Sequence, residues 1–268
     1  MFTLSGFGDE ISPDLTEQLD LLESEGVHHL ELRGVWNKNV LELSDEEAAR
    51  VKAELERRGF GVSAIASPIG KIGIDDPFEP HLARFRRALD LAEFFQAPYI
   101  RVFSFYVPAG QAAHYRQKVM DRMFALADAA KGRNVTLGLE NEHGLYGDVP
   151  KRALDLIRTL NSRQWVTVYD PCNYIMEGVR PHIQAFPMLV DTIGYLHIKD
   201  ADLATRKICV AGRGDGGIAE TLAELKKRGW SGFLSLEPHL LVAGVSSGVS
   251  GPALFRDAIR ALKGILPP

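Results

Sequence analysis

Short apolar runs alternate with longer amphipathic stretches from one end of this 268-residue chain to the other. The runs are rich in Val, Ile, Leu and aromatic residues, which is typical of strands in a sheet that helices cover. Dividing the chain by eight gives about 34 residues per unit, enough for one strand, one helix and two short loops. The predicted strands cover residues 2–7, 27–32, 61–66, 99–103, 135–140, 166–170, 193–198 and 232–237.

The segments between these strands have helical spacing and recognisable ends. Ser12 followed by Pro13 predicts the start of the first helix, and Gly26 predicts its end. Ser44 and Glu47 have the spacing of a capping box, which predicts the start of the second helix. Further helices are predicted over residues 77–96, 111–133, 150–161, 181–190, 217–228 and 252–263.

Eight strand–helix units without an intervening linker predict a single (β/α)8 TIM barrel, one domain over residues 1–268. The alternative is a doubly wound open sheet, which often has a Gly-rich phosphate turn after its first strand. Here the first strand leads into the segment GFGDE at residues 6–10. This segment lacks the G-x-G-x-x-G spacing and places two acids where a pyrophosphate would bind, so the barrel is favoured.

The charge balance narrows the classes of partner. The chain has 31 Lys and Arg against 35 Asp and Glu, a formal net charge of −4. A mildly acidic chain is not expected to bind nucleic acid or an anionic membrane.

Two cysteines are too few for a disulfide framework or a thiolate metal cluster. The N-terminal segment lacks the features of a signal peptide, and no apolar run is long enough to span a membrane, so we expect a cytoplasmic protein. An oligomer is compatible with the sequence.

Four successive predicted strands, the fifth to the eighth, end in a side chain that can bind a metal. These residues are Glu140, Asp170, His197 and Glu237. A single acid after a strand is more often a helix cap, but four such groups at equivalent positions are harder to explain in that way. Because TIM barrels carry their sites at the C-terminal ends of the strands, we expect the four to converge.

Strand alternation predicts which way these side chains face. Leu139 and Leu236 precede Glu140 and Glu237, so the leucines should face the helices and the acids the barrel axis. Three carboxylates and one imidazole form an oxygen-rich set that suits Mn²⁺ or Mg²⁺, with Co²⁺ or Zn²⁺ as alternatives. The sequence therefore predicts one divalent metal ion at the barrel mouth.

The order of several motifs resembles the sugar phosphate isomerase/epimerase branch of the xylose isomerase-like TIM-barrel superfamily. The motifs, which together cover nearly the whole chain, are GFGDEISPDL, ELRGVW, SPIGK, LENEHG, DPCN, HIKD, AGRGD and SLEPH. The resemblance implies that Glu140, Asp170, His197 and Glu237 bind one divalent metal. It also implies that Glu140 and Glu237 are the catalytic pair, exchanging protons with a substrate whose enediolate the metal stabilises as a Lewis acid.

Further polar residues follow the predicted strands and are expected around this centre. The expected substrate-binding residues are Arg33, Lys71, Asn173, Lys199 and Arg213. Residues expected to orient the ligands are Glu142, His143 and His239. Glu31 shares an end of the barrel with Arg33, and an alternative is that it pairs with Arg33 structurally.

The sequence thus predicts a metal-dependent isomerase or epimerase of a small sugar or keto-sugar. The alternatives are a metal-dependent dehydratase of a keto-polyol such as an inosose, and a catalytically inactive sugar-binding barrel. The family's ketose 3-epimerases place a substrate-binding Glu and Arg where this chain has Tyr146 and Leu203, which argues against a free ketohexose. The family's DNA-repair branch needs further His ligands where this chain has Arg33 and Ser67, which argues against DNA repair.

Overall fold

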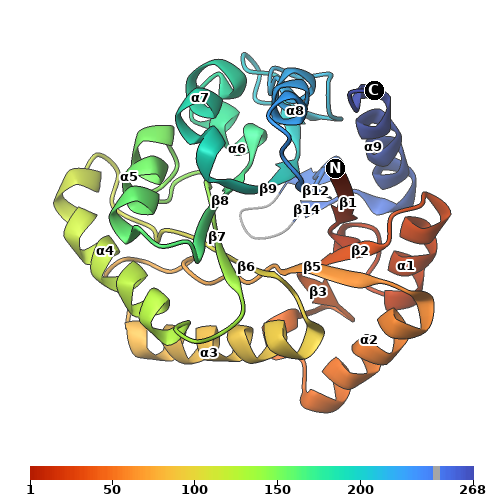
Figure 1. Cartoon of the computed structure of the whole chain (residues 1–268), viewed down its shortest axis with the longest axis horizontal. Coiled ribbons are helices and arrows are strands. Elements are labelled where there is room, and N and C mark those ends of the chain that lie inside the picture. The colour runs from red at the N-terminus through yellow and green to blue at the C-terminus, as the bar shows by residue number, and fades with distance from the viewer. Residues whose placement is uncertain (244–247) are drawn as a thin grey trace.

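The computed structural model describes residues 1–243 and 248–268, and within them eight parallel strands close into a barrel (Figure 1). Each strand pairs with its neighbours in chain order, and β1 pairs with both β2 and β12, which closes the circle and excludes the open sheet. The predicted barrel is therefore confirmed. The strands are β1 (Phe2–Gly6), β2 (His29–Leu32), β5 (Gly61–Ile65), β6 (Tyr99–Val102), β7 (Thr136–Glu140), β8 (Trp165–Tyr169), β9 (Ile193–Ile198) and β12 (Gly232–Leu236).

Helices surround the barrel on its outside (Figure 1). They are α1 (Leu15–Ser24), α2 (Asp45–Arg58), α3 (Phe78–Phe95), α4 (Ala112–Ala129), α5 (Pro150–Leu160), α6 (Pro171–Met176), α7 (Phe186–Leu189), α8 (Ile218–Lys227) and α9 (Gly251–Ile265). The helix predicted over residues 181–190 is wrong as one element. A π-helix over Pro181–Ala185 runs into the short α7, and the unpredicted α6 precedes them both.

The ends of the first two helices show which capping signals hold. Ser44 caps α2, and Glu47 completes the capping box, as predicted. The predicted start of α1 at Ser12 is wrong, because the side chain of Asp14 accepts the hydrogen bond from Glu17 N and the helix begins at Leu15. The Ser12 hydroxyl is instead bonded to the Glu17 carboxylate and to the Asp14 amide.

Five predicted strands end one residue too late, because Phe7, Ala66, Phe103, Asp170 and Glu237 lie outside the strands of the structure. Asp170 and Glu237 follow β8 and β12 rather than ending them. Three short hairpins at the C-terminal side of the barrel were also not predicted. They are β3 (Gly34–Val35) with β4 (Lys38–Asn39), β10 (Asp200–Ala201) with β11 (Ile208–Cys209), and β13 (Val242–Ala243) with β14 (Gly248–Val249).

The main core lies between the strands and the helices, and it contains Leu139 and Leu236, as alternation predicts. A separate small cluster of Ala64, Val168 and Tyr195 belongs to the inward faces of the strands. The remaining inward positions are largely polar, which leaves the C-terminal mouth free for charged groups. In the part of the chain that the structure describes, no helix is long and apolar enough to cross a membrane.

Candidate metal centre

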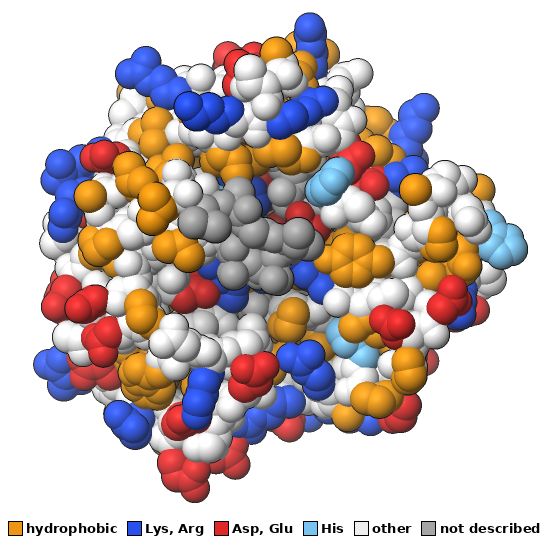
Figure 2. Space-filling model, turned by 180° about the vertical axis from the view of Figure 1, so that it is seen from behind, with side chains coloured by type: hydrophobic (Ala, Val, Ile, Leu, Met, Phe, Trp, Pro, Cys, Tyr) orange, Lys and Arg blue, Asp and Glu red, His pale blue; other side chains and the backbone are white. Residues whose placement is uncertain are grey.

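Four side chains from successive barrel strands converge at the C-terminal mouth. Glu140 ends β7, Asp170 follows β8 and caps α6, His197 lies in β9, and Glu237 follows β12. Each offers one ligand atom that lies within 4.8 Å of the others, and all four are buried. On this side of the barrel, acidic and basic side chains are visible around the centre of the face (Figure 2).

One nitrogen of His197 faces the three carboxylates. Its Nδ1 atom lies 3.1 Å from Glu140 Oε1, 3.5 Å from Glu237 Oε2 and 3.9 Å from Asp170 Oδ2. Glu140 Oε2 and Asp170 Oδ2 are both buried, and among the described residues their polar contacts are ion pairs without hydrogen-bond geometry. Ligand atoms bound to one cation at about 2.0–2.6 Å lie within about 5 Å of one another, so these residues fit a single divalent ion.

Two buried cations touch the same carboxylates. Lys199 Nζ lies 2.8 Å from Asp170 Oδ2 and 3.0 Å from Glu237 Oε2. Arg101 Nη1 lies 3.3 Å from Glu140 Oε2 and 3.6 Å from Glu237 Oε1. These contacts offset part of the desolvation cost of three buried acids.

The same contacts set the protonation of the ligands. Burial alone would raise the pKa of Glu140, but the charges of His197 and Arg101 lower it to about 2. The pKa of Glu237 is likewise held well below its usual range, against burial, chiefly by Lys199. Burial prevails at Asp170 and raises its pKa to about 6, although Lys199 opposes the shift. Two of the three carboxylates are therefore firmly ionised, and the third titrates near neutrality.

Asparagine side chains hold the Glu140 and Asp170 segments in place. Asn173 Nδ2 donates to Glu140 Oε1 at 3.2 Å, and its backbone N–H donates to Asp170 Oδ1 at 2.9 Å. The side chain of Asn141 bonds to both backbone groups of Asp170. Asn173, expected from sequence to bind substrate, lies directly against one proposed ligand and orients it.

Arg33 and His239 lie on the other side, against Glu237. Arg33 Nη1 donates to Glu237 Oε1 at 3.1 Å, and its Nε donates to Asp9 Oδ2 at 2.7 Å. His239 Nε2 lies 3.5 Å from Glu237 Oε1 and 3.3 Å from Glu10 Oε1. The alternative pairing of Arg33 with Glu31 is wrong, because the guanidinium of Arg33 forms ion pairs with Asp9 and Glu237 instead.

Other predicted site residues stay farther from the cluster. Lys71 Nζ donates to Glu142 Oε2 at 2.7 Å, and the charge of Glu142 contributes to raising the pKa of Lys199. His143 is exposed and its Nδ1 contacts Glu177. Arg213 is exposed too, and within the described residues no hydrogen bond or ion pair joins its side chain to the cluster. The structure thus does not bring His143 or Arg213 to the centre.

The model of one protein family matches residues 19–265, and its description is xylose isomerase-like TIM barrel. The chain belongs to the xylose isomerase-like TIM-barrel family. No curated protein matches it in sequence.

Solved structures of similar fold cover nearly the whole of this family member. The probable 3-DHS dehydratase AsbF of Bacillus anthracis is 18% identical with a TM-score of 0.74, over 97% of this chain and 98% of that one. A D-tagatose 3-epimerase-like protein is 17% identical with a TM-score of 0.75, over 98% and 96%. A xylose isomerase-like TIM-barrel protein from Mycobacterium smegmatis, in complex with magnesium, is 17% identical with a TM-score of 0.71, over 99% and 97%. At these identities the likeness establishes the fold.

Two buried charges of this xylose isomerase-like barrel were not considered from the sequence, and a third, Glu31, was considered only as a partner of Arg33. Glu31, Arg101 and Glu10 are all at most 5% exposed and contact cluster residues or their neighbours. A signal existed for two of them. Leu30 and Leu32 flank Glu31, and Ile100 and Val102 flank Arg101, so alternation alone could have placed both charges inside the barrel.

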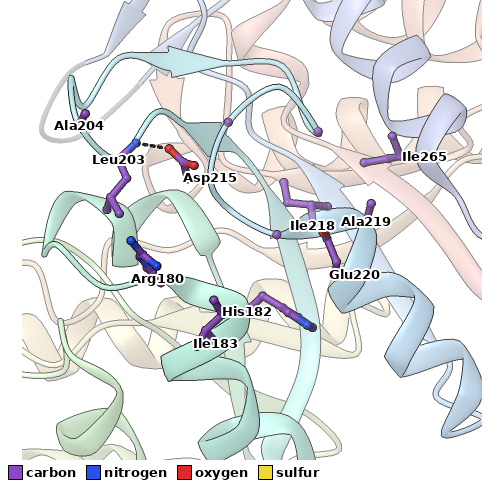
Figure 3. A pocket seen from close by; sticks show the side chains of 13 residues that line it. Arg180, His182, Ile183, Leu203, Ala204, Asp215, Ile218, Ala219, Glu220 and Ile265 are labelled. Carbon is purple, nitrogen blue, oxygen red and sulfur yellow. Dashed lines mark hydrogen bonds between the residues drawn. The ribbon is translucent and has the colours of Figure 1, made fainter.

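A second hollow of about 700 Å³ lies beside the loop between β9 and α8 (Figure 3). It is lined in part by Arg180, Leu203, Asp215 and Glu220, and none of the four cluster residues lines it. Leu203 N donates to Asp215 Oδ2 at 2.7 Å across the loop. The loop itself is fixed by Asp200, whose buried carboxylate accepts the amides of three loop glycines, Gly212, Gly214 and Gly216.

Proposed function

We propose that this protein is a divalent-metal-dependent isomerase or epimerase of a small sugar or keto-sugar. The observation that carries the proposal is the convergence of Glu140, Asp170, His197 and Glu237 at one buried point of the barrel mouth. Those four residues would hold the ion, with Mn²⁺ or Mg²⁺ favoured by three carboxylates and one imidazole. The ion would supply Lewis-acid polarisation of a substrate carbonyl.

Glu140 and Glu237 are the acid–base pair of this proposal. Their lowered pKa values keep both carboxylates ionised near neutral pH, so either can accept a proton from the carbon beside a carbonyl. They come from β7 and from the end of β12, with β8 and β9 between them in the barrel. A substrate between these strands would meet one carboxylate from each side. One carboxylate would remove the proton and, now protonated, would return it to the neighbouring carbon in an isomerisation. In an epimerisation the opposite carboxylate would first have to take up a proton from water, which it would then deliver to the other face of the same carbon.

Lys199 is the residue of the mouth best suited to hold a substrate oxygen. The neighbouring Asp170 and Glu237 raise the pKa of its ammonium well above the usual range, despite burial. The group therefore stays charged and donates hydrogen bonds. Arg33 and Asn173 restrain Glu237 and Glu140 from outside, so that each carboxylate keeps its direction.

A sugar or polyol substrate is supported by the neighbours in fold, one of which is a D-tagatose 3-epimerase-like protein. Tyr146 is buried and Leu203 lines the second hollow, so neither position supplies the charged group expected of a free ketohexose 3-epimerase. We therefore propose a substrate of the same chemistry but not a free ketohexose.

A dehydratase is the second candidate, and the position of Lys199 favours it. The carboxylate that takes the proton from carbon could pass it to the hydroxyl that leaves from the next carbon, and the Lys199 ammonium could donate a hydrogen bond to that hydroxyl. The fold neighbour described as a probable 3-DHS dehydratase is consistent with this reaction.

The deciding experiment offers keto-sugars, inososes and their phosphates to the Mn²⁺-loaded protein in D2O. Deuterium uptake beside the carbonyl, followed by NMR, reports proton removal, and loss of one water from the product mass identifies a dehydratase. Deuterium uptake should stop on chelation of the metal and in the Glu140→Gln and Glu237→Gln variants. The control variant Glu177→Gln should retain the uptake, because Glu177 pairs with His143 outside the cluster. Uptake that survives EDTA, or that both cluster variants retain, would refute the proposal.

A further inference from the structure

A buried carboxylate lies behind the imidazole of His197, on the side away from the other three ligands. Glu31 Oε1, from β2, is 3.2 Å from His197 Nε2, while His197 Nδ1 is 3.1 Å from Glu140 Oε1. Both residues are fully buried. The two nitrogens of the ring therefore face two different carboxylates, one inside the cluster and one outside it.

We propose that Glu31 is a positioning residue, which accepts the Nε2–H of His197 and thereby leaves Nδ1 as the metal-binding nitrogen. An imidazole that binds a metal is neutral and carries one proton, and the nitrogen that donates this proton to a hydrogen bond cannot bind the metal. Glu140 also faces the ring, but it would be a ligand of the ion. With the ion bound, Glu31 is therefore the carboxylate that is left to accept the remaining proton, at Nε2. The inference rests on the metal centre of the proposed function.

Tyr195 strengthens the position of Glu31. It precedes His197 by two residues in β9, so both side chains lie on the same inward face of the strand. Its hydroxyl donates to the same Glu31 Oε1 at 3.1 Å. Glu31 Oε1 thus accepts two hydrogen bonds from one strand, and both hold the carboxylate beside the His197 ring.

Aromatic packing fixes the plane of the His197 ring. Phe7 meets it edge to face with a centroid distance of 5.2 Å, and Tyr195 does so at 5.6 Å. A rotation of the ring that exchanged the two nitrogens would have to displace these neighbours and break the hydrogen bond from Nε2 to Glu31. The tautomer is therefore determined by Glu31, and the orientation by the packing.

The first test measures Mn²⁺ affinity by calorimetry in wild type, Glu31→Leu, Glu31→Gln and Tyr195→Phe. Removal of a carboxylate that hydrogen-bonds to a metal-binding histidine usually weakens metal binding about 10- to 100-fold, and we expect that loss for Glu31→Leu. Glu31→Gln keeps an acceptor oxygen and should lose less. Tyr195→Phe should lose less still. Tyr174→Phe, which removes another buried hydroxyl that has no hydrogen-bond partner among the described residues, should not change the affinity.

The second test reads the tautomer directly, by NMR of the ¹⁵N-histidine-labelled protein loaded with Mg²⁺. Wild type and Tyr195→Phe should show His197 protonated at Nε2, and this readout stands even where Glu31→Leu fails to fold. Protonation at Nδ1, or unchanged Mn²⁺ affinity in folded Glu31→Leu, would overturn the proposal. Failure of wild type to bind either ion would overturn it together with the proposed function. Normal binding without proton exchange on any substrate would refute the proposed function alone.

Discussion

The Nη1 atom of Arg101 lies 3.3 Å from Oε2 of Glu140, inside the barrel and away from water. The same nitrogen lies 3.6 Å from Glu237 Oε1, so one guanidinium serves both carboxylates of the proposed catalytic pair. Glu140 and Arg101 come from adjacent strands, β7 and β6. Arg101 therefore provides a fixed positive charge beside the place where a divalent cation would add more.

Replacing Arg101 by Met should destabilise the metal-free protein by about 3–5 kcal/mol, because it leaves buried carboxylates without their cation. Added Mn²⁺ should restore a larger share of stability in the variant than in wild type, since the ion then supplies the missing positive charge. Urea unfolding with EDTA and with Mn²⁺ measures both effects. Arg116→Met removes a half-exposed pair with Asp155 and should cost about 1 kcal/mol or less in either condition. An equal response to Mn²⁺ in wild type and Arg101→Met would contradict this account.

Mn²⁺ affinity should fall as the pH drops through about 6. Burial raises the pKa of Asp170 to about 6, so this carboxylate carries a proton below that pH, and a protonated carboxyl group does not bind a metal. Titration calorimetry at about pH 7.5, 6.5 and 5.5, which bracket that pKa, measures the fall in Mn²⁺ affinity. Asp170→Asn should bind Mn²⁺ weakly throughout, and Asp155→Asn, at the protein surface, should behave as wild type. An affinity that does not change across this range would contradict this account of Asp170.

The neutral form of His81 should stabilise the protein only above moderately acidic pH. His81 Nε2 accepts the backbone N–H of Gly70 at 2.7 Å, and burial lowers the pKa of the imidazole to about 4. A group whose pKa is depressed on folding gives its full stability above the unfolded value, near 6.5, and loses it as the pH falls towards 4. Urea midpoints should therefore decline more steeply between pH 6.5 and 4 in wild type than in His81→Gln, which does not titrate. Parallel curves for the two proteins would exclude this linkage.

The first helix should depend on Asp14 rather than on Ser12. Asp14 accepts the Glu17 amide at the helix start, and loss of such a cap typically costs about 1 kcal/mol. Asp14→Ala should therefore lower the free energy of unfolding by about that amount, measured by urea titration. Ser12→Ala should have the smaller effect, because Ser12 does not cap the first turn. The reverse order would support the original sequence prediction.

Local sequence patterns accounted for most of the fold. Apolar runs at regular intervals and helix-end residues such as Ser44 identify the strand–helix units, because these signals depend on neighbours within a few residues. The same patterns misplaced the start of the first helix and merged the segments after β8. At the first helix, Ser12 and Asp14 are both able to cap the helix, and Asp14 does so. After β8, a π-helix interrupts the regular helical spacing.

The ligand types at the strand ends were also evident from sequence, since Glu140 and Glu237 alternate with leucines on their own strands. The residues that contact these ligands were not evident from the sequence. Glu31 and His197 are 166 positions apart, and Arg33 and Glu237 are 204 apart. Alternation tells which face of a strand a side chain occupies, but not which group meets it across the barrel.

The sequence by itself determined the barrel, the order of its strands and the set of groups able to bind a metal. Only the tertiary structure decided that Arg33 contacts Asp9 and Glu237, that Arg101 contacts Glu140, and that Glu31 lies behind His197. The physical reason is that periodicity is a property of each segment, whereas these contacts depend on the closure and register of eight strands within the described residues.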